Sequence, residues 1–153
     1  MMRIIVTGGA IIEDAWGRIL LQRRSDYGNW GLPGGGMEPG ELIEDTMKRE
    51  VREETGLEVT GFELYGVYSG PRMQYTYPDG NEVVFVMFIF RAEADLRGKL
   101  ADDGKRLKFS DDAGESLELE FKYLEDIEDL PVSSVQRPVF VDLMKKQQGI
   151  LRF

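Results

Sequence analysis

Three glutamates, Glu50, Glu53 and Glu54, lie at spacings of i, i+3 and i+4. At about 100° per residue, a helix would present all three carboxylates within roughly a 100° arc of its surface. Carboxylate oxygens are hard ligands that suit Mg²⁺ or Mn²⁺, and Mg²⁺ usually takes substrate phosphate oxygens as further ligands. The cluster therefore predicts a site for a divalent cation and a phosphorylated substrate. The alternative is an acidic, solvated helix face.

The segment that carries these glutamates is expected to be a helix over residues 41–55. Pro39-Gly40 breaks the chain before it, and Gly56 suits the left-handed residue that ends a helix. An apolar stripe for the core recurs at i, i+4 and i+8 and consists of Ile43, Met47 and Val51.

A glycine-rich stretch, residues 30–36, leads into this helix and holds four glycines in seven positions. Glycine lets backbone N–H groups turn toward a ligand and lets the chain approach a phosphate closely. A tight turn between a strand and a helix explains the same glycines, and the two interpretations are compatible.

Residues 35–57 read GGMEPGELIEDTMKREVREETGL. They fit Gly-x5-Glu-x7-Arg-Glu-aliphatic-x-Glu-Glu-x-Gly-aliphatic at every fixed position, and so resemble the Nudix box. The resemblance implies an α/β/α sandwich with a mixed β-sheet and the box as a loop-helix-loop, in a single domain over residues 1–153. It also implies hydrolysis of a nucleoside diphosphate linked to another group, by water attack on phosphorus, with Mg²⁺ or Mn²⁺.

The resemblance assigns roles residue by residue. The metal ligands that it implies are Glu50, Glu53 and Glu54, with backbone groups at Gly35. Arg49 matches the arginine that orients a box glutamate through an ion pair and is placed with the catalytic residues. Glu41 matches the first box glutamate, whose role varies between structure and metal support, and is placed beside the substrate.

The general base is left open by the sequence. The chain has no histidine, so acid–base work falls to carboxylates, Lys, Tyr or metal-bound water. The base is either a box glutamate or one near the late strand, where Glu115-x-x-Glu118-x-x-Phe121 is similar to a Glu-x-x-Glu-x-x-Trp pattern of the family. Glu118 is therefore placed with the catalytic residues, while Glu115 and Glu120 are further candidates. Surface acids on an edge strand are the alternative.

Arg23 and Arg24 precede the glycine loop, and either could grip a phosphate bidentately. Exposed strand arginines are the alternative. Four aromatic residues could stack on a base or simply pack, namely Tyr27, Trp30, Tyr75 and Tyr77.

Two residues that could indicate the substrate point to different substrate classes. Pro71 lies near a proline of ADP-ribose hydrolases, and Tyr75 lies near a tyrosine of diadenosine polyphosphate hydrolases. We expect ADP-ribose or a related nucleoside diphosphate derivative first, and a nucleoside triphosphate next.

Elements before and after the box suggest an α/β arrangement with a mixed sheet between helices. Strands are expected at 3–12, 18–24, 59–69, 82–94 and 117–123, with the first two forming a hairpin. The run 83–90 is almost wholly apolar, which predicts a central strand buried on both faces. A last helix is expected over 137–148, with Pro138 in its first turn and Gly149 at its end.

The composition narrows the partners. The net charge is −9 and basic residues do not cluster, so duplex nucleic acid is not expected. There is no cysteine, no signal peptide and no apolar run of membrane-spanning length, which leaves the cytoplasm as the expected location. The sequence does not decide whether the protein forms a homodimer. The apolar tail 150–153 either docks on another surface or frays. A domain that binds a nucleotide without cleaving it is the rival function.

Overall fold

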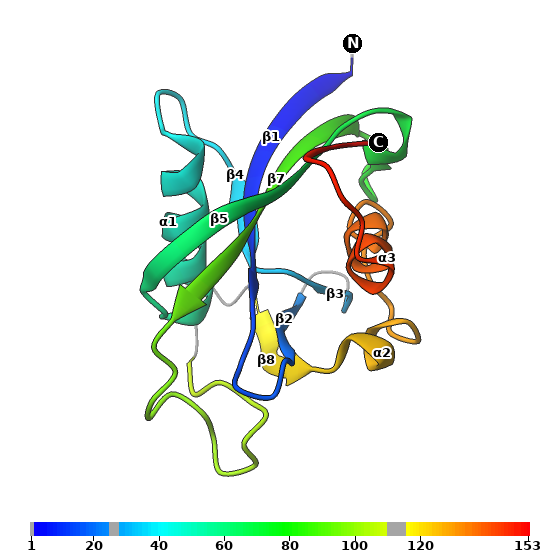
Figure 1. Ribbon diagram of the computed structural model, residues 1–153. Coiled ribbons are helices and arrows are strands. Elements are labelled where there is room, and N and C mark those ends of the chain that lie inside the picture. Colours follow the sequence, from blue (N-terminus) through cyan, green and yellow to red (C-terminus); the bar gives the residue numbers. More distant parts are fainter. Residues whose placement is uncertain (1, 25–27, 110–115) are drawn as a thin grey trace.

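The computed structural model describes residues 2–24, 28–109 and 116–153 of the chain. In this described part, six strands form the larger of two sheets, in the order β4-β1-β7-β5-β9 with β6 paired to β7 (Figure 1). The strands are β1 Arg3–Ile12, β4 Gly34–Gly36, β5 Val59–Tyr68, β6 Gln74–Thr76, β7 Glu82–Ala94 and β9 Leu151–Arg152.

The larger sheet is mixed, as predicted. β7 runs parallel to β1 and antiparallel to β5, and it lies between them. The predicted central position of β7 is confirmed, whereas its predicted burial on both faces is confirmed only in part. Met87, Ile89 and Phe90 are buried, whereas Phe85 is half-buried because its side chain lines a pocket.

The smaller sheet joins β3 Trp30–Gly31, β2 Ile19–Arg24 and β8 Ser116–Lys122 in antiparallel pairs. A tight turn links β1 to β2, in which the carboxylate of Asp14 accepts the N–H groups of Trp16 and Arg18. Beyond this turn the two strands enter different sheets, so the predicted hairpin is wrong apart from one isolated bridge between Glu13 and Ile19.

Helices cover both faces of the larger sheet (Figure 1). Helix α1, Ile43–Thr55, lies on one face, and α3, Arg137–Lys145, lies on the other beside the short α2, Leu124–Ile127. Alternation along β1 serves both layers: Ala10 and Ile12 belong to the core under α1, and Ile11 belongs to the core under α3. The fold is the predicted α/β/α sandwich.

Two predicted helix boundaries are wrong. α1 begins at Ile43 rather than 41, because Glu41 lies before the helix and its carboxylate binds other groups. Its end at Gly56, with φ of 74°, is as predicted. α3 ends at Lys145 rather than 148, because Lys146 already adopts the left-handed conformation, with φ of 54°.

The C-terminal tail docks on the sheet. β9 pairs in parallel with Val67 and Tyr68 of β5. The side chain of Arg152 is buried there and donates to the hydroxyl of Tyr68 at 3.0 Å and to Asp142 at 3.3 Å. Among the described residues, no helix has both the length and the apolar character needed to cross a membrane.

Candidate active site

The three box glutamates differ sharply in exposure. All three belong to α1, yet Glu54 is only 3% exposed whereas the side chain of Glu53 is 56% exposed. The side chain of Glu50 is 15% exposed. The helical spacing therefore brings the three residues to one side of α1, and the surrounding chain then buries one carboxylate and leaves another at the surface.

Glu54 lies in a cradle of hydrogen-bond donors. Nε2 of Gln22, on β2, donates to one carboxylate oxygen at 2.7 Å, and the N–H of Gly34 donates to the other at 2.8 Å. Burial raises the pKa of Glu54 to about 7, against the effect of these two hydrogen bonds, and the negative charge of Glu50 adds to the rise. The site thus holds a carboxylate whose negative charge is poorly compensated by the protein, which favours a cation beside it.

Arg49 joins the box glutamates to the loop before the helix. Its Nε and Nη2 donate to the two carboxylate oxygens of Glu41, at 2.8 and 3.1 Å, and Nη2 also reaches the carbonyl of Gly36 at 3.0 Å. Its Nη1 lies 2.9 Å from Glu50 and 3.4 Å from Glu53. One guanidinium therefore contacts three of the four glutamates at fixed positions of the motif, namely Glu41, Glu50 and Glu53.

Glu41 is a structural anchor in this arrangement. The hydrogen bonds from Arg49, from the hydroxyl of Thr46 at 2.7 Å and from the N–H of Glu38 lower the pKa of Glu41 to about 2. Its carboxylate is thus fully occupied by the protein. This placement supports the structural side of the role that the resemblance left variable, rather than direct contact with substrate.

Two glycines of the loop leave no free space for a Cβ atom. A Cβ at Gly34 would lie 2.6 Å from the carbonyl oxygen of Gly8, and a Cβ at Gly35 would lie 2.5 Å from the carboxyl carbon of Glu50. The contact at Gly34 is with backbone, so glycine is required there for β4 to pair with β1. The contact at Gly35 is with the flexible end of Glu50, which a side chain at this position would displace from the loop.

The donor set fits a hard divalent cation. In the described part of the chain, no three acidic side chains already converge to the spacing of a metal site. However, Glu50 and Glu54 interact electrostatically, and the carboxylate of Glu50 rests on the backbone of Gly35. Rotation of the exposed Glu53 side chain away from its long contact with Arg49 would supply a third carboxylate.

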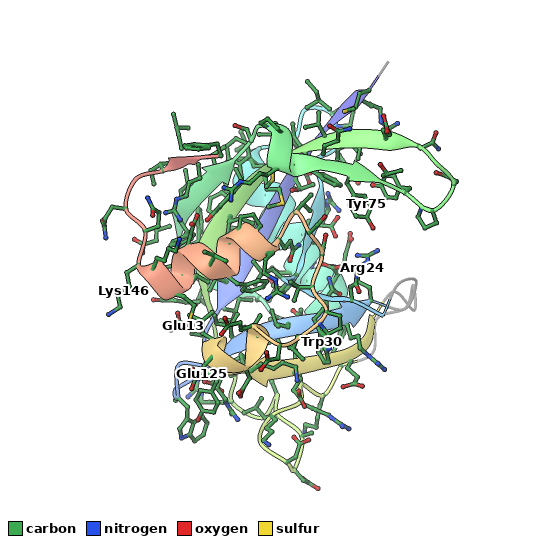
Figure 2. The ribbon with its side chains drawn as sticks, turned by 90° about the vertical axis from the view of Figure 1, so that its right-hand side faces the viewer. Glu13, Arg24, Trp30, Tyr75, Glu125 and Lys146 are labelled. Carbon is green, nitrogen blue, oxygen red and sulfur yellow. The ribbon has the colours of Figure 1, made fainter. Side chains whose placement is uncertain are left out.

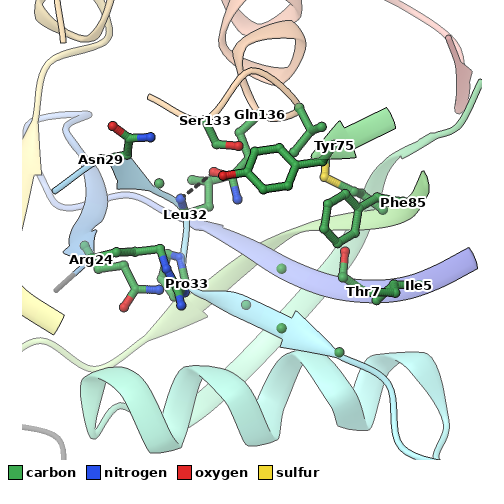
Figure 3. Close-up of a pocket in the computed structure, with 18 of the residues that line it drawn as sticks. Ile5, Thr7, Arg24, Asn29, Leu32, Pro33, Tyr75, Phe85, Ser133 and Gln136 are labelled. Atoms are coloured by element: carbon green, nitrogen blue, oxygen red, sulfur yellow. Dashed lines mark hydrogen bonds between the residues drawn. The ribbon is translucent and has the colours of Figure 1, made fainter. Parts of the chain in front are cut away.

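A pocket of about 320 Å³ opens beside the same glycine loop (Figure 3). Its floor includes Gln22, Arg24 and the loop 33–36. One wall is aromatic: Tyr75 contacts Tyr77 edge to face, with ring centroids 5.2 Å apart, and lies 6.2 Å from Phe85. In Figure 2, Tyr75 lies above Arg24 and Trp30, on the side from which the β6–β7 hairpin projects.

A second wall comes from the segment just before α3. Ser133 and Gln136 line it, and Oε1 of Gln136 accepts the N–H of Leu32 at 2.8 Å (Figure 3). In the view of Figure 3, the side chain of Tyr75 extends toward that of Gln136. Amide, hydroxyl and aromatic groups around a cavity of this kind suit a planar polar ring.

Alternation along β2 separates the two candidate arginines. Gln22 faces Glu54, so Arg24 lies on the same side and Arg23 on the opposite side. Arg24 accordingly lines the pocket and lowers the pKa of Glu54 slightly, against the larger effect of burial. Arg23 pairs with Glu118 of β8 at 3.3 Å instead.

The candidate bases of the late strand lie away from the box. Glu118 and Glu120 alternate with Leu119, whose partner across the strands is Gln22, so both face away from Glu54. Glu120 forms an ion pair with Lys122. Glu115 and Tyr27 lie outside the described residues.

Sequence reasoning passed over two residues that line the site. Gln22 shares a strand face with the buried Leu20. A polar residue on an apolar face needs a hydrogen-bond partner, so this position could have been recognised as part of the site. Gln136 lies more than 100 positions from Leu32, so no local pattern could place it in the pocket.

Fold and site together define an α/β/α domain in which a glycine loop and the helix after it form one side of a pocket. A family model described as the NUDIX domain matches residues 3–143. The chain therefore belongs to the Nudix hydrolase family, as residues 35–57 indicated.

Comparisons with individual proteins agree. A Bacillus subtilis protein described as an uncharacterized Nudix hydrolase, YvcI, is 31% identical over 136 residues, which are 88% of this chain and 75% of that protein. The ADP-ribose pyrophosphatase of Methanocaldococcus jannaschii is 36% identical over 112 residues, which are 70% of this chain but only 61% of that protein. The crystal structure of a MutT protein from Methanosarcina mazei has the same fold, with a TM-score of 0.70 at 24% identity over 97% of this chain and 98% of that one.

Proposed function

We propose that this protein hydrolyses the pyrophosphate link of a nucleoside diphosphate derivative, using Mg²⁺ or Mn²⁺. The observation that carries the proposal is the shared glycine loop. Its residue Gly34 binds the buried carboxylate of Glu54, and the same loop lines the floor of the pocket. A substrate in the pocket would therefore present its phosphates next to the box carboxylates.

The proposed metal ligands are the carboxylates of Glu50, Glu53 and Glu54, together with the backbone of Gly35. Held by these groups, a divalent cation would supply charge neutralisation at the phosphates and activation of water. Arg49 holds the carboxylate of Glu50 in place, and Glu41 in turn holds Arg49. These residues supply orientation, so the reacting groups meet without a large loss of entropy at each turnover.

On the substrate side, Arg24 is the proposed phosphate contact and the aromatic wall with Gln136 is the proposed site of the base. Arg24 is the better placed of the two arginines because it lines the pocket, whereas Arg23 is paired with Glu118. The placement of Glu118 and Glu120 on the far face of their sheet favours a box glutamate as the general base.

ADP-ribose or a related derivative leads among the substrates. The relative from Methanocaldococcus jannaschii is named for ADP-ribose, and the matched region holds most of this chain. A nucleoside triphosphate is the second candidate substrate, since it combines a base with linked phosphates in the same way. We further propose that residues 1–153 form a single domain in the cytoplasm. A homodimer is a further possibility, which a measurement of the mass in solution would test.

The test is turnover on a panel of ADP-ribose, dinucleotides and nucleoside triphosphates with Mg²⁺ or Mn²⁺. We expect release of a nucleoside monophosphate or phosphate by the wild type, and a fall in kcat of at least about 100-fold in Glu53→Gln, since even indirect partners of a metal site contribute about 10–100-fold. Glu63→Gln, at an exposed position of β5, is the matched control.

The rival function is a domain that binds a nucleotide without cleaving it. It predicts nucleotide binding with no product on any member of the panel. Turnover that Glu53→Gln leaves untouched would count against the proposed site even if the enzyme is active.

A further inference from the structure

Gln22 is an unusual residue for its place in the fold. It is only 2% exposed, on a strand whose neighbouring residues Leu20 and Leu21 are wholly buried. Burying an amide is unfavourable unless its polar atoms form hydrogen bonds. Its presence beneath the box helix therefore needs a reason beyond core packing.

The contact with Glu54 supplies that reason. Nε2 of Gln22 donates to one carboxylate oxygen at 2.7 Å, while the N–H of Gly34 donates to the other at 2.8 Å. A donor on each oxygen fixes the rotation of the carboxylate plane. Because an ionised carboxylate has about four acceptor sites, such a cradle leaves lone pairs for a further ligand.

The neutrality of the amide matters as well. A lysine or arginine at position 22 would donate to Glu54 but would also cancel its charge, and would repel a cation next to it. Glutamine orients the carboxylate and leaves its negative charge in place. This combination is the one that a metal ligand needs from a neighbouring group.

We propose that Gln22 is a positioning residue that holds Glu54 in the orientation in which it binds the divalent cation. This inference rests on the proposed function. It extends the site beyond residues 35–57, to a strand residue that precedes Glu54 by 32 positions.

The direct test compares wild type with Gln22→Met, which keeps the length of the side chain and removes the donor. Binding of Mn²⁺ alone is measured by electron paramagnetic resonance, and kcat and KM are measured at saturating metal. We expect the Kd for Mn²⁺ to rise and kcat to fall, each by about 10-fold or more, with KM for the nucleotide changing by less than about threefold. Gln148→Met, an exposed position near the C-terminus, is the matched control and should behave as wild type.

A purely structural role gives a different result. It lowers the melting temperature but leaves the Kd for Mn²⁺ and the kcat of the folded protein unchanged, and that outcome overturns the proposal. If Gln22→Met does not fold, Gln22→Asn carries the test, because it keeps the amide but sets it back by one methylene. Unchanged metal affinity and kcat in Gln22→Asn would overturn the proposal, and a loss of both supports it.

Different results would exclude the proposed function and the role of Gln22. A wild type that neither binds Mn²⁺ nor turns over any nucleotide removes the proposed function, and this inference with it. A wild type that does both, with Gln22 variants indistinguishable from it, removes only the role of Gln22.

Discussion

Arg49 grips Glu41 with two parallel hydrogen bonds, from Nε at 2.8 Å and from Nη2 at 3.1 Å. The pair closes the loop before α1 onto the helix, since the same guanidinium also bonds the carbonyl of Gly36 and the carboxylate of Glu50. Such a planar fork is specific to arginine, because lysine offers a single point of donation.

The first prediction follows from this fork. Arg49→Lys keeps the charge but cannot bind Glu41, Gly36 and Glu50 together, so we expect kcat to fall by about 10–100-fold. We expect the free energy of unfolding to fall by about 1–3 kcal/mol, as for lost hydrogen bonds to a charged group. Steady-state kinetics and urea denaturation measure the two effects. Arg52→Lys, exposed on the same helix, is the control, and equal kcat values for the two variants would contradict the role given to Arg49.

The second prediction concerns pH and the stability of the metal-free protein. Burial raises the pKa of Glu54 from its ordinary value of 4.5 to about 7, so the folded state holds more protons than the unfolded state between these values. The contribution of Glu54 to the free energy of unfolding is therefore fully present below about pH 4.5. It falls by up to about 3 kcal/mol as the pH rises through 7.

Urea denaturation at a series of pH values in EDTA measures this dependence. The fall in the free energy of unfolding between pH 4.5 and 7 should be smaller in Glu54→Gln, whose side chain cannot ionise, than in the wild type. Equal falls in the two proteins would show that Glu54 does not titrate in this range. Addition of Mg²⁺ should restore stability to the wild type at pH 8, because a ligand that binds only the folded state stabilises it.

The third prediction separates the two neighbouring arginines. Arg24→Ala should lower kcat/KM by about 10–100-fold, the range expected for a lost hydrogen bond to a charged group. Arg23→Ala should change it by less than about threefold, because its partner is Glu118 on the other face of the sheet. Each variant serves as the control for the other. The reverse order of effects would mean that the phosphates do not lie along the glycine loop.

The fourth prediction concerns the pocket walls. Tyr75→Ala should raise KM by about 5-fold or more, since stacking of a base on an aromatic ring contributes about 1–3 kcal/mol. Gln136→Leu should also raise KM, because it removes the amide and leaves the N–H of Leu32 without its acceptor. Tyr123→Ala, at an exposed tyrosine outside the pocket, is the control. KM values that stay at the wild-type level in both pocket variants would remove the base from this cavity.

Local signals predicted the elements that carry the box. The apolar stripe through Met47 and Val51 placed α1 against the sheet, and Gly56 ended it, because both effects act within a few residues of the chain. Strand β7 was likewise visible from its apolar run. By contrast, β3 and β4 have two and three residues, too short for any periodicity, and exist only because β2 and β1 offer them an edge.

The sequence by itself determined the family and the types of group at the site, because a motif of fixed spacing on one helix keeps Arg49, Glu50, Glu53 and Glu54 near one another in any fold that preserves the helix. Only the tertiary structure decided their environments. The cradle of Glu54 includes Gln22 from β2, the pocket includes Gln136 from the segment just before α3, and the docked tail depends on Tyr68 meeting Arg152. These contacts join residues 32, 104 and 84 positions apart, and hydrogen bonding over such separations leaves no mark in local sequence.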